Sequence, residues 1–183
     1  MRDVFFGLQV AVLAPPHDPW RRRLSALVRQ YVRDLPLQDQ RGLFGSLANL
    51  LHEAIDRCPL GYWDFVWDGE SEYVEWVTGI EDDAAELWAP DTSGDRMDHV
   101  LVSALFLLSG EGASATVAGD RCALPEDEWQ TRATWRCLFE TLGMLDFASV
   151  RSCALYVTPG GDRQAFSLRE LRGEGYAYLV PVE

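Results

Sequence analysis

The sequence contains no lysine, because all sixteen of its basic residues are arginine. This absence excludes Schiff-base catalysis and the lysine-dependent phosphate sites of P-loop and kinase-type proteins, since each of these needs an amine or ammonium group. A GC-rich bacterial genome that replaces lysine with arginine accounts for the bias.

Cysteine and histidine are scarce as well. The four cysteines include no C-x-x-C pair, so we interpret them as reduced structural thiols of a cytoplasmic protein. The three histidines share no ligand spacing, and His52-Glu53 lacks the second histidine of an H-E-x-x-H motif. We therefore predict no metal site and no cofactor, and we expect His52 to contact Asp56 one helical turn away.

Long hydrophobic runs are also missing. The longest, Val100 to Leu108, is too short for a membrane span, which needs roughly 18 apolar residues. The N-terminal residues 4–12 alternate in hydrophobicity, as expected of a strand and not of a signal peptide. The sequence predicts a soluble, cytoplasmic protein.

Length and composition fit one packed domain over residues 1–183, with 48% apolar residues. Alternation and β-branched content predict strands at residues 4–12, 62–67, 72–77, 100–108 and 150–158, with a short returning strand within 110–119 and an edge strand within 176–182. We expect the second and third of these to form a hairpin across Asp68-Gly69.

Helical spacing predicts three long helices, at residues 19–35, 39–58 and 125–142, and shorter helical segments at 81–88 and 167–172. Asp18-Pro19 caps the first helix, Gly143 ends the third, and Ser167 with Glu170 forms a capping box. The predicted order is β-α-α-β-β-(α)-β-α-β-α. This order indicates an α+β fold, a mostly antiparallel sheet with helices packed on one face.

A G-x-G-x-x-A pattern, Gly110 to Ala115, resembles a dinucleotide-binding motif. We reject it because the following residues, TVAGDRCALP, indicate no helix whose N-terminus could bind a pyrophosphate. Glu111 would also add a negative charge there. We interpret the pattern as a turn.

Negative charge is concentrated in one segment. Residues 64–98 hold twelve carboxylates against one base, Arg96, in a chain of net charge −13. Aromatic residues run through the same segment, and an arginine stripe lies on the first predicted helix. The residues that we expect to bind partners are Trp63, Trp67, Asp68, Glu70, Glu72, Tyr73, Glu75 and Trp76, together with Arg22, Arg29 and Arg33.

No catalytic motif is present, so we predict a non-enzymatic interaction or regulatory domain whose acidic, aromatic surface binds a basic protein partner or a second copy. A net charge of −13 argues against nucleic acid. One alternative is a small-molecule or carbohydrate-binding protein, including a hydrolase, that uses a pocket of Trp and carboxylate side chains. Asp82-Asp83 is not such a pair, because adjacent residues on a helix point about 100° apart, and we interpret it as part of a solvated face. A second alternative is a structural homo-oligomer.

Several segments together resemble one family: FFGLQVAVLA, LLHEAIDRCPLGYWDFVW, DHVLVSALFLLSGEG, SVRSCALYVTP and GEGYAYLVPV. The chain is similar across most of residues 4–182 to an uncharacterised bacterial and chloroplast family that includes the plant fluctuating-light acclimation protein. It differs from that family in its acidic middle segment, and it lacks the transmembrane and Gly-rich segments of the plastid members. The resemblance implies a soluble, regulatory α+β domain with no known chemistry.

Overall fold

The computed structural model describes residues 2–31, 36–86, 98–160 and 164–183. Within these ranges the chain forms a five-stranded antiparallel sheet with the strand order β4-β3-β1-β2-β5. The strands are β1 (Asp3–Leu13), β2 (Leu60–Trp67), β3 (His99–Ser109), β4 (Val150–Thr158) and β5 (Val180–Pro181). The helices are α1 (Pro19–Tyr31), α2 (Arg41–Ala54), α3 (Glu70–Glu86), α4 (Ala113–Cys122) and α5 (Arg132–Met144).

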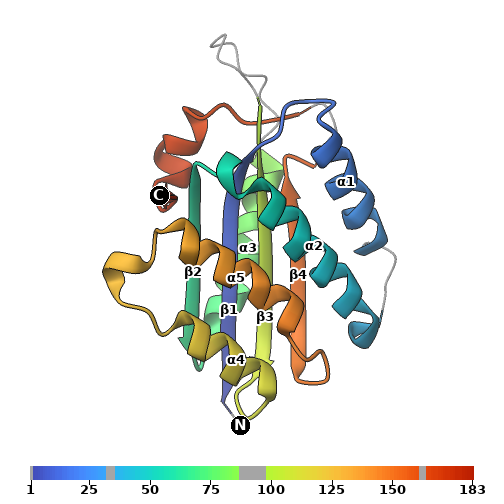
Figure 1. Ribbon diagram of the computed structural model, residues 1–183, viewed down its shortest axis with the longest axis vertical. Coiled ribbons are helices and arrows are strands. Elements are labelled where there is room, and N and C mark those ends of the chain that lie inside the picture. Colours follow the sequence, from blue (N-terminus) through green and yellow to red (C-terminus); the bar gives the residue numbers. More distant parts are fainter. Residues whose placement is uncertain (1, 32–35, 87–97, 161–163) are drawn as a thin grey trace.

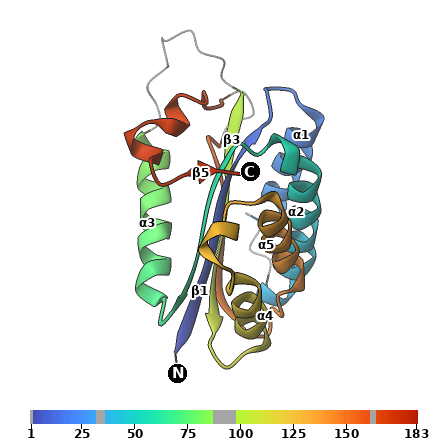
Figure 2. The same cartoon turned by 60° about the vertical axis from the view of Figure 1, so that its left-hand side comes forward.

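The sheet is covered on both faces. Helices α1, α2, α4 and α5 lie on one face (Figure 1), and α3 lies on the opposite face, as the rotated view shows (Figure 2). The α+β class and the antiparallel sheet predicted from the sequence are confirmed. The helices are not confined to one face, because α3 packs on the other. No helix in the described ranges combines the length and apolar character needed to cross a bilayer.

Strand β1 lies at the centre of the sheet, as its continuous burial requires. Its even-numbered apolar residues face the four-helix layer, where Phe6 and Phe106 stack with their ring centroids 6.2 Å apart. Phe44 of α2 contacts Phe106 edge-on at 4.7 Å. Phe5, on the opposite face, packs under α3. Each face therefore has its own core, which explains why β1 and β3 are apolar at nearly every position.

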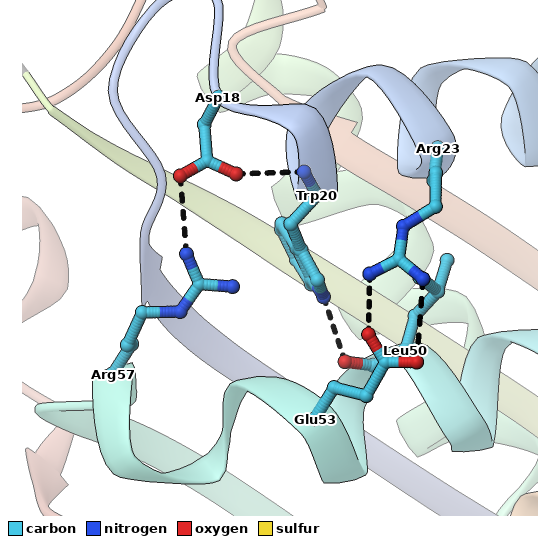
Figure 3. Close-up of polar contacts among 6 residues, drawn as sticks. All are labelled: Asp18, Trp20, Arg23, Leu50, Glu53 and Arg57. Atoms are coloured by element: carbon cyan, nitrogen blue, oxygen red, sulfur yellow. Dashed lines mark hydrogen bonds and ion pairs between the residues drawn. The ribbon is translucent and has the colours of Figure 1, made fainter.

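Helices α1 and α2 are joined by a small polar network (Figure 3). The Asp18 carboxylate accepts a hydrogen bond from the backbone N–H of Trp20 at 2.7 Å, the predicted N-cap, and pairs with Arg57 at 3.1 Å. The indole N–H of Trp20 donates to the carbonyl of Leu50 at 2.7 Å. One buried ring is thus fixed to both helices.

The predicted hairpin is wrong, because the residues after Asp68-Gly69 form α3 instead of a strand. Asp68 has a positive φ of 58°, and the chain turns there onto the second face of the sheet. Tyr73, Trp76, Val77 and Ile80 then follow at spacings of three, one and three residues, which place them on one side of a helix. The predicted short helix at 81–88 is the end of α3 as far as Glu86, and residues 87–97 lie outside the described ranges.

The returning strand predicted within 110–119 is also wrong, because α4 occupies Ala113–Cys122. Ala115 and Ala118 are among its buried positions. A helix therefore does follow the G-x-G-x-x-A pattern, and its predicted absence is no argument against a dinucleotide site. The topology excludes that site instead, since β3 and β4 are antiparallel neighbours and not the parallel strands of a βαβ unit.

The second predicted helix, 39–58, shortens to α2 (Arg41–Ala54) between two 3₁₀ turns, and both boundaries of the third predicted helix move. The third long helix begins after the N-cap Thr131, whose side chain accepts from the N–H of Thr134, and a separate 3₁₀ turn, η3 (Glu126–Glu128), follows Pro125. The helix continues through Gly143 to Met144. Its buried face, with Trp135 and Phe139, is as predicted.

The C-terminal segment closes one end of the sheet. The predicted capping box is confirmed, because the carboxylate of Glu170 accepts from the N–H of Ser167 at 2.6 Å and the hydroxyl of Ser167 accepts from the N–H of Glu170 at 3.2 Å. The predicted edge strand shortens to β5, which pairs with only two residues of β2, Leu60 and Gly61.

Candidate functional site

The candidate site is the outer edge of β2. Its inner edge pairs with β1 from Leu60 to Trp67, but on its outer edge no described strand pairs beyond Gly61. The carbonyl of Pro59 accepts from Val182 N–H on this side, and the N–H of Phe65 is bonded only to the adjacent Asp64 carboxylate, at 2.8 Å. Because backbone groups alternate along an antiparallel strand, the N–H and C=O groups of Trp63, Phe65 and Trp67 point outward.

Aromatic rings surround this edge on both faces of the sheet. Trp63 contacts Trp129 edge-on, with 5.6 Å between centroids, and its indole N–H donates to the Trp129 carbonyl at 3.2 Å. Trp67 contacts Phe65 at 5.6 Å. On the α3 face, Tyr62 stacks on Trp76. Trp67 is 55% exposed and Trp129 43% exposed, whereas the other rings are half-buried. The half-buried rings therefore line the edge, and Trp67 and Trp129 project into solvent.

A groove of about 240 Å³ runs beside the edge. Its floor and walls come from β2, from the end of α4, from the segment after η3 and from β5, and the lining residues are Tyr62, Trp63, Asp64, Phe65, Cys122, Trp129, Gln130 and Val180. Asp64 is the one carboxylate among these described lining residues. The groove therefore combines apolar walls with a single negative charge beside unpaired backbone groups.

Burial raises the pKa of the Asp64 carboxyl above its ordinary value, although the hydrogen bond from Phe65 N–H opposes the shift. Burial also raises the pKa of Tyr62, and the charges of Asp64 and Glu72 add to that effect. In the groove wall, burial raises the pKa of the Cys122 thiol to about 12. These shifts have burial as their main cause, so they indicate a partly desolvated groove, and the Asp64 charge adds to the effect at Tyr62 and Cys122.

The acids of α3 and its preceding turn lie near the same edge or face solvent. Asp68, Glu70 and Glu75 are exposed, and Glu72 is half-buried with its carboxylate 3.2 Å from the indole nitrogen of Trp76. Asp68 pairs with Arg2 at 3.4 Å. On the other side of the groove, η3 adds three exposed acids directly before Trp129. No described arginine forms an ion pair with Asp64, Glu70, Glu72 or Glu75.

The structure separates the two halves of the predicted partner surface. The aromatic and acidic residues predicted from Trp63 to Trp76 gather on β2 and α3, at one side of the molecule. Arg22 and Arg29 are exposed on α1, which lies beyond the opposite edge of the sheet (Figure 1). Arg33 lies outside the described residues. Arg21, which flanks the stripe, is buried and donates to the backbone carbonyls of Ala14 and Gln164.

Of the eight described residues that line the groove, only Trp63 was predicted as a site residue. The missed residues on which the argument depends most are Asp64, Trp129 and Tyr62. Asp64 and Tyr62 are the chain neighbours of the predicted Trp63 on β2, and this adjacency was the signal in the sequence that could have identified them. Trp129 reaches the groove from sixty-six residues away in sequence, and nothing in the sequence pairs it with Trp63.

No group of three or more potential metal ligands gathers in the described part of the chain. His52 lies 3.9 Å from Glu140, while Asp56 pairs with Arg132 at 3.3 Å, so the predicted His52–Asp56 contact is wrong. The four cysteines are free thiols.

Comparisons with models of protein families, with curated proteins and with solved structures find no match for this chain. The family resemblance inferred from the sequence therefore stays a prediction, and the geometry of the site carries the functional argument.

Proposed function

We propose that this protein is a non-enzymatic interaction domain that binds a basic, extended segment of a partner protein along the outer edge of β2. The observation that carries the proposal is the outward-facing backbone of Trp63 to Trp67, which no described strand covers and which lies beside a groove lined by aromatic rings. An extended peptide placed there would continue the sheet through main-chain hydrogen bonds.

Charge selects a basic partner. The groove contains Asp64, α3 carries exposed acids on one side and η3 carries more on the other. Arginine side chains on one face of an added strand would meet the acids of η3 and stack on the rings of Trp129 or Trp67, whereas arginine side chains on the other face would meet Asp64 and the acids of α3. A long exposed strand edge favours aggregation. When no partner is bound, the Asp64 carboxylate accepts the hydrogen bond from Phe65 N–H and so protects this edge from pairing with another chain.

The proposal is tested with two peptides of alternating sequence, (Arg-Val)₃ and (Glu-Val)₃, titrated against the protein while tryptophan fluorescence is followed. We expect saturable binding of the arginine peptide alone, weakening as salt increases because the attraction is screened. Trp129→Ala should lower its affinity by roughly tenfold, a typical effect for a ring at an interface centre.

Arg22→Ala and Arg29→Ala are the matched controls, since both lie on the far side of the molecule and should leave the affinity unchanged. Equal binding of both peptides, or binding that ignores salt and the Trp129 change, would contradict the proposal.

A further inference from the structure

A second cavity, of about 220 Å³, lies on the α3 face of the sheet and is separate from the groove beside β2. Its described lining residues are Gln9, Tyr62, Trp76, Gly79, Ile80 and Tyr178. The cavity separates two apolar clusters, one under α3 and one under the C-terminal segment. None of these described residues carries a charge.

The floor of this cavity is polar although it lies in the middle of the sheet. Gln9 is the one polar residue from position 4 to 12 of β1, and Ser103 is the one polar residue from 100 to 108 of β3. They are register partners, 3% and 0% exposed, and the Gln9 amide nitrogen donates to the Ser103 hydroxyl at 2.9 Å. Burying two polar side chains where apolar ones would pack costs stability, which points to a role beyond folding.

The Gln9 carboxamide can form further hydrogen bonds. It offers two N–H donors and two acceptor lone pairs. One donor is bonded to Ser103 and one lone pair accepts from the Tyr178 hydroxyl at 2.6 Å. One N–H and one lone pair have no partner among the described residues, and Gln9 lines the cavity. These two groups are the donor and the acceptor that an amide-like ligand needs.

The walls are flat rings. Tyr62 and Trp76 stack at 5.5 Å with 21° between their planes, and Tyr178 contacts Tyr62 edge-on at 5.8 Å. Burial raises the pKa of Tyr62 above its ordinary value. Gly79 completes the wall within α3, where a Cβ would meet nothing within 4 Å. Glycine inside a helix costs about 1 kcal/mol relative to alanine, and no close contact explains it here.

From these features we infer that the cavity is a binding site for a small, flat, uncharged aromatic amide or lactam-like heterocycle. Its ring stacks against Tyr62 and Trp76, and its amide edge bonds to the Gln9 carboxamide. An anion is disfavoured because no cationic side chain lines the described cavity and because Glu72 lies beside Trp76. The inference does not depend on the proposed function, since the cavity and the groove share only Tyr62 among their described lining residues and the ligand makes no contact with the outward backbone of β2.

The test uses two probes of the same shape, benzamide and benzoate, titrated into ¹⁵N-labelled protein. The resonances followed are the side-chain NH₂ of Gln9 and the indole N–H of Trp76. We expect benzamide to shift both signals saturably with a Kd of roughly 1 mM, an ordinary affinity for so small a ligand, and benzoate to bind at least about tenfold more weakly.

Two variants separate binding from folding. Gly79→Leu should fold, because leucine favours a helix and the space is open, yet its side chain should occupy the cavity and lower benzamide affinity by at least about threefold. Gly42→Leu is the matched control in α2, where a Cβ also meets nothing within 4 Å, and it should bind normally. Gln9→Leu should abolish the preference for benzamide over benzoate. Equal affinity for the two probes, no saturable shift, or unchanged binding by Gly79→Leu would overturn the inference.

Discussion

Tyr62 of β2 and Trp76 of α3 stack with their ring centroids 5.5 Å apart and their planes 21° apart. This contact fixes α3 against the second face of the sheet and separates the groove beside β2 from the cavity above Gln9. Phe5 adds a further contact to Trp76, at 5.3 Å. Aromatic residues of the acidic segment therefore have a structural role in placing α3 as well as the proposed role in binding.

Asp64→Asn is expected to weaken binding of the basic peptide without destabilising the fold. The pKa of Asp64 is raised from 3.8 by burial. The folded protein therefore holds this proton more tightly than the unfolded chain does, so the stability that it contributes is present at pH values below 3.8 and is lost as the pH rises through the raised pKa. At neutral pH the charge opposes folding, and the amide removes it while keeping the acceptor for Phe65 N–H.

Thermal unfolding at about pH 7 together with the (Arg-Val)₃ titration checks this prediction. The melting temperature should stay equal or rise while the peptide affinity falls. A fall in melting temperature at neutral pH would show that the ionised carboxylate stabilises the fold, which is the opposite of the effect that its raised pKa implies.

Asp18→Ala is expected to lower the free energy of unfolding by about 1–2 kcal/mol, because it removes both the N-cap of α1 and the ion pair with Arg57. Asp18→Asn keeps an oxygen that can cap Trp20 N–H and should lower it by less than about 1 kcal/mol. Urea denaturation of both variants measures the difference. Equal losses would assign the whole effect to the ion pair.

Gly61→Ala is expected to destabilise the fold by about 1–3 kcal/mol, the usual effect of overpacking. A Cβ at this position would collide with the indole ring of the buried Trp135 and would lie 3.2 Å from the Gln9 carbonyl oxygen. Gly42→Ala, at an open helical position, is the control and should stabilise by about 0.5–1 kcal/mol. If both variants unfold at the same urea concentration, the close approach of β2 to Trp135 is not as described.

The sequence predicted the strands and helices wherever local pattern and long-range packing agree. Residues 4–12, 100–108 and 150–158 are strands as expected, and α1 and α2 follow their apolar spacing. The predicted strand at residues 72–77 is wrong, because aromatic and β-branched content favours a strand while the positions of Tyr73, Trp76, Val77 and Ile80 also fit a helix. Packing against Tyr62 and Phe5, far away in sequence, decides between the two.

The helix α4 was missed for a related reason. Gly110, Gly112 and Gly119 favour turns, whereas the buried spacing of Ala115 and Ala118 was a weak helical signal. The sequence predicted that the candidate site is acidic and aromatic, but not that it lies at the outer edge of β2. Which strand lies near the edge of a sheet, and which distant residue faces it, depends on strand order and register, and neither can be read from the local pattern of Trp63 to Trp76.

Strand addition at β2 can be observed by hydrogen exchange of the β2 amides in the presence of (Arg-Val)₃. In strand addition the outward N–H groups of Trp63 and Phe65 gain partners, whereas those of Tyr62 and Asp64 are already directed at β1. We predict that exchange slows at Trp63 and Phe65 and stays unchanged at Tyr62 and Asp64. Binding of the peptide without this alternation, or with protection confined to residues outside β2, would contradict strand addition at this edge.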